Sequence, residues 1–245
     1  MPTEGTPSSV ARAVPVPQAR RGPLLVVLGL ALLVSWACYA LVVRPWVPSA
    51  SPWAELLTNV GARTVFWGGP CAVYLWRVQG ARWREPLGLA FPYGRRQVVS
   101  ALVVPVVVAA LLIWATARQL GVAFEVLLAA FVEQARPRFT APLFEELVFR
   151  GVVVSEALSV ARESAPSVGS WRWRYWGAQL AAAALFTLVH WPWWLMDRGL
   201  EGTLAASLPL FATGLILGVV FGQTRSLWPC VLLHWVNNEL SVVTL

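Results

Sequence analysis

An uninterrupted apolar run near the N-terminus constrains this chain more than any other feature. Residues 24–43 contain no charged side chain over 20 positions. At 1.5 Å per residue, a helix over this run is about 30 Å long, which matches the hydrocarbon core of a bilayer. The whole chain is 58% hydrophobic and only 13% charged, whereas soluble domains carry about 25% charged residues. The sequence therefore favours an integral membrane protein over a soluble one.

Further apolar segments predict an all-α, polytopic bundle of transmembrane helices. These segments are residues 56–76, 98–117, 140–161, 175–194, 203–222 and 227–244. Residues 119–134 are short and contain Glu125 and Glu133, so we expect an interfacial or re-entrant helix there rather than a crossing. The prediction is seven or eight membrane helices, four of which form a core in the C-terminal half.

The chain divides into three parts by composition. Residues 1–22 are rich in proline and contain little to bury, which predicts a disordered tail. Residues 23–138 carry the first membrane helices and amphipathic segments, and residues 139–245 carry the C-terminal core. A cleaved signal peptide is disfavoured, because the first apolar run is longer than a typical signal core and further spans follow it.

The net charge of +7 comes from arginine alone, because the sequence contains no lysine. These arginines lie between apolar runs and not along one amphipathic segment, which argues against a nucleic-acid partner. With the tail inside, a topology of seven crossings and one of eight both put most of the loop arginines on the cytoplasmic side. We therefore expect a cytoplasmic N-terminus, and the composition favours a bacterial inner membrane. Seven and eight crossings give different topologies for the second half of the chain, and the sequence does not choose between them.

Two carboxylates and a guanidinium lie close together at residues 144–151 of the predicted helix 140–161. Such groups cost about 2.5 kcal/mol or more in a bilayer, so each is a candidate for function. Glu146 and Arg150 are four residues apart on one face, which predicts an ion pair. Glu145 is rotated by about 100° and has no partner in its own helix, so it is free to accept a proton. A purely structural ion cluster is the alternative.

The chain contains only two histidines, and they lie in two other predicted spans. His190 precedes several tryptophans of the kind found at membrane interfaces. His234 and Asn238 are four residues apart and share one helix face. Antiparallel packing of helices 140–161 and 175–194 would bring Glu145 and His190 to similar depth. We expect all four side chains to converge on one cavity.

These residues resemble the three motifs of the CPBP family of intramembrane endopeptidases, also called the Abi or CAAX-protease family. The motifs are Glu145-Glu146-x-x-x-Arg150, Phe186-x-x-x-His190 and His234-x-x-x-Asn238. The resemblance extends over about residues 139–240. It includes the glycine-containing stretch from Phe211 to Gly218 and the segment from Thr224 to Pro229 that precedes His234.

The resemblance implies an enzyme that hydrolyses a peptide bond near the membrane surface. Glu145 would activate a water, His190 would assist it, and His234 with Asn238 would stabilise the oxyanion. Glu146 belongs to the same catalytic motif, and Arg150 would serve as its structural ion-pair partner. A Cys–His pair using Cys230 is disfavoured, because it leaves the glutamates without a role.

The resemblance leans towards catalysis without a tightly bound metal, and no cofactor is otherwise indicated. Zinc remains open, because Glu145, His190 and His234 could form a site with one position left for water. The substrate is expected to be a membrane protein or a lipid-anchored peptide whose C-terminal region is processed, as in the sorting-type, myxosortase-like members. The alternatives are an inactive scaffold or immunity protein and, further off, a proton or ion transporter.

Overall fold

The computed structural model describes residues 20–46, 60–80, 87–89, 103–134 and 139–243. Every regular element in these ranges is helical, which confirms the all-α class. The predicted disordered tail lies outside the described residues except for its last three positions. Parts of the predicted spans 56–76 and 98–117 also lie outside them.

Two of the described helices are long and apolar enough to cross a membrane. One extends over Arg21–Trp46, 26 residues, and the other over Trp191–Thr224, 34 residues. The first comprises helix α1 (Arg21–Cys38), the π-helix η2 (Tyr39–Val43) and a final turn of 3₁₀-helix, η3 (Arg44–Trp46). Its outward face exposes Val26, Leu30 and Val34, as expected for a helix in contact with lipid. The larger count of seven or eight crossings is not established by these helices.

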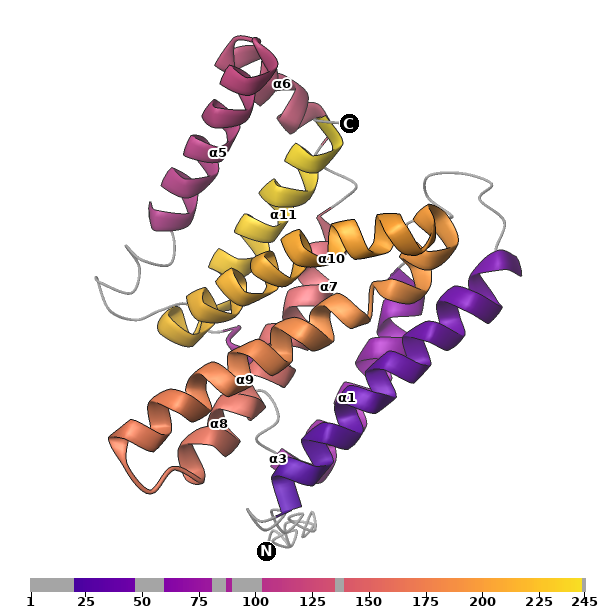
Figure 1. Cartoon of the computed structure of the whole chain (residues 1–245), viewed down its shortest axis with the longest axis vertical. Coiled ribbons are helices and arrows are strands. Elements are labelled where there is room, and N and C mark those ends of the chain that lie inside the picture. Colours follow the sequence, from indigo (N-terminus) through magenta and orange to yellow (C-terminus); the bar gives the residue numbers. More distant parts are fainter. Residues whose placement is uncertain (1–19, 47–59, 81–86, 90–102, 135–138, 244–245) are drawn as a thin grey trace, which may run out of the picture.

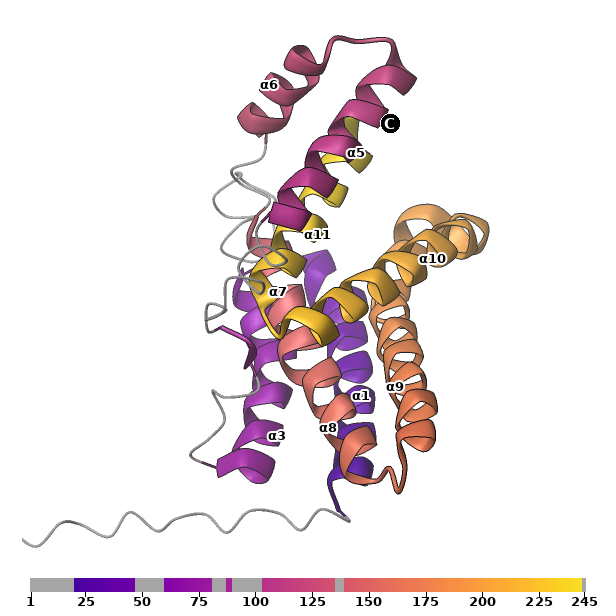
Figure 2. The ribbon, with the colours of Figure 1, turned by 90° about the vertical axis from the view of Figure 1, so that its left-hand side faces the viewer.

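The helix after α1 packs along it (Figures 1 and 2). It comprises the π-helix η4 (Thr64–Gly68) and helix α3 (Gly69–Gln79). Arg63, which interrupts the predicted span 56–76, is the last residue before the π-helix. A π-turn widens the helix by one residue and changes the direction of neighbouring side chains.

A continuous helical segment carries the two adjacent glutamates. It consists of α7 (Thr140–Glu146), the π-helix η8 (Leu147–Val154) and α8 (Ser155–Glu163). Helix α9 (Val168–Leu188) follows after a short turn and packs against α8. Helix α9 begins seven residues before the predicted start at 175, because Ser167 and Ser170 form a capping box.

The last two helices complete the C-terminal core. Helix α10 (Trp191–Thr224) contains a break at Gly199, where φ is 68°. The predicted span 203–222 is therefore only the second part of a longer element. Helix α11 (Leu227–Val243) follows closely and agrees with the prediction for 227–244 to within one residue.

Helices α5 (Val104–Leu120) and α6 (Phe124–Gln134) form an arm beside α11 (Figure 2). Gly121 ends α5 in a left-handed conformation, which separates the two helices. Helix α6 has 11 residues, about 16 Å at the rise of an α-helix, which is shorter than a bilayer core. This length agrees with an interfacial or re-entrant element.

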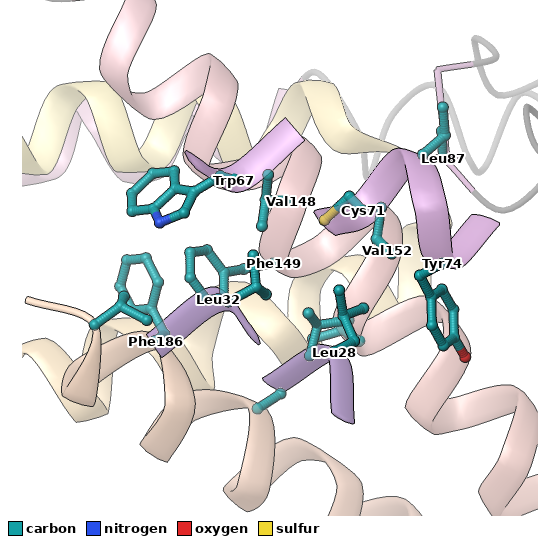
Figure 3. Close-up of a cluster of buried hydrophobic side chains, with 14 of the residues drawn as sticks. Leu28, Leu32, Trp67, Cys71, Tyr74, Leu87, Val148, Phe149, Val152 and Phe186 are labelled. Carbon is teal, nitrogen blue, oxygen red and sulfur yellow. The ribbon is translucent and has the colours of Figure 1, made fainter. Parts of the chain in front are cut away.

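Aromatic side chains from three helices meet in the centre of the bundle. Trp67, Phe149 and Phe186 pack edge to face in sequence, with ring centroids 5.6 and 5.0 Å apart (Figure 3). Leu28 and Leu32 of α1 join the same buried cluster. The N-terminal helices and the C-terminal core thus share one hydrophobic interior.

Glycine on α10 allows the close approach of α9. A Cβ atom at Gly214 would lie 3.1 Å from Phe186 and 3.4 Å from the Cα of Ala183. These distances leave no room for a larger side chain, because protein interiors are close-packed. Small residues at such positions are typical of helix contacts within membranes.

We predict that Gly214→Leu lowers the stability of the protein by about 1–3 kcal/mol or more through overpacking. Thermal unfolding in detergent measures this change. The control is Gly177→Leu on the exposed face of α9, where an added Cβ meets nothing within 4 Å. Equal unfolding temperatures for the two variants would contradict the close packing of α9 and α10.

Candidate active site

Glu145 and Glu146 are the last two residues of α7 and directly precede the π-helix η8. Their exposed fractions are 5% and 0%. Because adjacent helix residues are rotated by about 100°, the two carboxylates point in different directions and have different neighbours. Glu146 points into the packed interior, whereas Glu145 lines a cavity.

Glu146 is the centre of a buried polar network. Its Oε1 accepts hydrogen bonds from Arg150 Nη1 at 2.9 Å and from His234 Nδ1 at 2.7 Å. Arg150 also donates from Nη2 to the carbonyl of Gly214 at 3.1 Å, and its guanidinium lies 4.5 Å from the ring centre of Phe186. The Glu146–Arg150 ion pair is thus present and links α7 and η8 to α10 and α11.

His234 is held by its Nδ1 and presents its Nε2 to Glu145. An ionised carboxylate can only accept hydrogen bonds, so the contact with Glu146 requires a proton on Nδ1 of His234. The other ring nitrogen, Nε2, lies 3.5 Å from Glu145 Oε2. The side chain of His234 is only 3% exposed, so this geometry is fixed by packing.

His190 is held in a similar way from the turn between α9 and α10, because α9 ends at Leu188 and not at 194 as predicted. Its Nδ1 lies 2.7 Å from the backbone carbonyl of Phe186, and a carbonyl only accepts, so this nitrogen carries a proton. Its Nε2 faces the same Glu145 Oε2 at 3.7 Å. The side chain is 22% exposed. Two imidazole Nε2 atoms therefore face one carboxylate oxygen, and the one from His190 is open to solvent.

Arg63 is a site residue that the sequence reasoning did not assign. Its Nη2 lies 3.5 Å from Glu145 Oε1. The guanidinium stacks on the rings of Trp36 and Trp67, 5.7 and 5.6 Å from their centres. The position of Arg63 inside the apolar run 56–76 could have indicated this role, because charged residues within membrane segments are often functional.

A cavity of about 240 Å³ opens onto these groups. This volume admits several waters, since one water needs about 10–15 Å³. The carboxylate of Glu145 and the imidazole of His190 line it together with aromatic and basic side chains, namely Trp36, Tyr39, Arg44, Arg63, Trp67 and Trp193. Water can therefore reach the carboxylate of Glu145.

Three other residues named from the sequence, His234, Asn238 and Cys230, lie outside this cavity lining. The prediction that all four side chains converge on one cavity is therefore wrong for His234 and Asn238, and only Glu145 and His190 line it. Asn238 is half-buried one turn after His234 on α11, and it is not among the residues that line the cavity. Cys230 is fully buried and its Sγ lies 3.4 Å from the carbonyl of Leu217. The thiol thus faces α10, away from Glu145.

A bound metal was left open by the sequence. Within the described ranges, no group of three or more His, Cys, Asp or Glu side chains is arranged to hold a metal ion. Glu145, His190 and His234 as they stand therefore do not form a ready zinc site. We derive no chemical step through a metal.

The comparison with protein families agrees with the motifs. Residues 128–240 match the family described as type II CAAX prenyl endopeptidase Rce1-like. No curated protein sequence and no solved structure matches the chain. The matched region contains Glu145, Glu146, Arg150, His190, His234 and Asn238. This part of the chain, which carries most of the candidate site, is therefore similar to the CAAX-protease family of membrane-embedded endopeptidases.

Proposed function

We propose that this protein is an intramembrane endopeptidase that hydrolyses a peptide bond close to the membrane surface. The observation that carries the proposal is that the imidazoles of His190 and His234 both lie beside the carboxylate of Glu145. Both Nε2 atoms lie within 3.7 Å of its Oε2, at a cavity large enough for water and part of a peptide. The similarity of residues 128–240 to a family of endopeptidases supports the same reaction class.

In the proposed mechanism, Glu145 removes a proton from a water in the cavity. The resulting hydroxide forms a C–O bond to the peptide carbonyl carbon. The tetrahedral intermediate then collapses, the C–N bond breaks, and the leaving amine takes up the proton that Glu145 removed, with Nε2 of His190, 3.7 Å from Glu145 Oε2, assisting the transfer. A positioned acid or base of this kind contributes about 10²–10⁴-fold to a rate. Glu146 acts indirectly, because it orients His234 and does not line the cavity.

The negative charge that develops on the carbonyl oxygen needs donors nearby. We propose His234 and Asn238 for this role, as the family motifs imply. Because Nδ1–H of His234 already donates to Glu146, His234 donates to the oxyanion from Nε2 in its doubly protonated form. Arg63 adds a permanently charged donor that lines the same cavity. Its stacking on Trp36 and Trp67 reduces the freedom of the side chain before substrate binds.

The position of the arginines bears on which compartment the cavity faces. One end of the bundle gathers Arg20, Arg21, Arg77, Arg162, Arg172, Arg174 and Arg225. At the end that holds the cavity, Arg44 and Arg63 line it, and Arg198 lies over the ring of Trp194, which contacts His190. Since positive loops stay in the cytoplasm, we propose that the N-terminus is cytoplasmic and that the cavity opens on the opposite face.

This orientation supports exported or membrane-anchored proteins as substrates. A segment that reaches the cavity from the outer face of a bacterial inner membrane belongs to a protein that has already been translocated. Trp193 lines the cavity and Trp46 is 84% exposed nearby, which agrees with a position at the membrane interface. We propose that the C-terminal region of such a protein is the substrate, and that the enzyme acts as a sorting-type protease.

We predict that Glu145→Gln lowers cleavage by at least about 100-fold, because the base is lost while the shape is kept. Mass spectrometry of membrane-protein C-termini compares cells that produce each variant. Glu156→Gln is the control, because Glu156 is equally buried in the same helical segment but lines no part of this cavity. Cleavage by Glu145→Gln at the normal rate would favour the scaffold, and loss of proton flux in liposomes would favour transport.

We predict that Arg63→Met lowers the cleavage rate by about 100-fold or more, because an oxyanion donor beside Glu145 is removed. Methionine keeps an apolar stem between the two tryptophans. The matched control is Arg77→Met, since Arg77 also stacks on a tryptophan at 5.6 Å but at the other end of the bundle. A folded Arg63→Met protein with the normal rate would remove Arg63 from the mechanism.

We predict that a cysteine introduced by Arg198→Cys reacts with a membrane-impermeant maleimide added to intact cells, whereas one introduced by Arg172→Cys does not. The exposed Cys38 is first replaced by alanine; Cys71 and Cys230 are buried. Labelling of both variants after permeabilisation shows that each site is reactive. The reverse pattern in intact cells would place the cavity on the cytoplasmic side.

A further inference from the structure

A second cavity lies at the arginine-rich end of the bundle, away from the candidate active site. Its volume is about 450 Å³, within the range of natural ligand pockets. It lies where the ends of several helices meet. Arg21 begins α1, Gln79 ends α3, Arg162 lies in the last turn of α8, and Arg225 follows α10.

Guanidinium groups dominate the lining of this cavity. Arg162 and Arg225 are exposed and both line it. Arg21 donates from Nη1 to Glu163 at 3.3 Å, but its buried Nε has no hydrogen-bond partner within the described residues. The hydroxyl of Ser159 adds a further polar group to the wall. This set of donors suits an anion with several oxygens, because arginine pairs with phosphate in a bidentate manner.

One carboxylate limits how far an anion can enter. Glu156 lines the cavity but is only 1% exposed. It accepts hydrogen bonds from Gln79 Nε2 at 2.6 Å and from the Tyr74 hydroxyl at 3.3 Å. An anion is therefore expected near the exposed Arg162 and Arg225 and not beside Glu156.

The surrounding side chains place this cavity at the level of lipid headgroups. Trp76 in α3 and Trp173 and Trp176 in α9 are 65%, 82% and 44% exposed near the same end. Exposed tryptophans concentrate where a bilayer meets water. Basic pockets between membrane helices at this depth bind anionic headgroups.

We propose that this cavity binds a phosphate-bearing anion through Arg162 and Arg225. The anion is either the headgroup of an anionic phospholipid or a soluble phosphate compound, since both present the same oxygens to the arginines. Binding here is independent of the proposed peptidase activity, because none of the cavity residues contacts Glu145 or His190 in the structure.

The test uses the purified full chain in detergent and the double variant Arg162→Gln/Arg225→Asn. Asparagine is chosen at 225 because this residue has a φ of 53°, which asparagine tolerates. Native mass spectrometry counts the phosphatidylglycerol and the phosphatidylcholine retained by each protein. The control is Arg172→Gln, which removes one exposed charge from the same end but does not line the cavity. A second arm measures the unfolding temperature with inorganic phosphate.

We expect the wild type and Arg172→Gln to retain phosphatidylglycerol over phosphatidylcholine, and the double variant to bind it about 30-fold more weakly. If only inorganic phosphate stabilises the wild type, and not the double variant, the ligand is a soluble phosphate compound. The proposal is overturned if the double variant retains as much phosphatidylglycerol as the wild type. It is also overturned if the wild type shows neither greater retention of phosphatidylglycerol nor greater stabilisation by phosphate than the double variant. The same measurement on Glu145→Gln shows that the result does not depend on peptidase activity.

Discussion

The buried contact between Glu146, Arg150 and His234 is the interaction on which the rest of the site depends. One carboxylate oxygen of Glu146 accepts from both partners, and Arg150 also binds the backbone of Gly214. The contact therefore joins the α7–η8 segment to α10 and α11 in the buried interior. Removing one member of such a buried pair leaves an uncompensated charge and costs about 3–5 kcal/mol. Its structural consequence is that the imidazole of His234 has one orientation, with Nε2 directed at Glu145.

The adjacent glutamates show how one helix can supply both structure and chemistry. Glu146 forms an ion pair with Arg150 of its own helical segment, whereas the ion-pair neighbours of Glu145, namely Arg63, His190 and His234, all come from other elements. The π-helix that follows them offsets the turns of the segment, and such offsets are frequent at functional sites. Similar π-helices follow Arg63 and begin at Tyr39, so three segments that line the cavity share this local geometry.

The two ends of the bundle differ in charge and in the groups they expose. The smaller cavity is lined by Glu145, His190, two arginines and several aromatic side chains, while the larger one is lined by three arginines and the buried Glu156. The unequal distribution of arginine between the two ends supports both proposals, namely the membrane face to which the active-site cavity opens and the anion site at the opposite end. Exposed tryptophans occur at both ends, which agrees with a position of each end at a membrane interface.

The sequence by itself determined the helical class, the Glu146–Arg150 pair and the motif residues, because these follow from apolar periodicity, spacing within one helix and family resemblance. Only the tertiary structure decided that Arg63, Trp36 and Trp67 join the site, that Asn238 lies outside the cavity lining, and that helix α9 begins before residue 175. The reason is physical: spacing along a chain fixes which residues share a helix face, whereas contacts between helices depend on how the side chains of separate helices pack together.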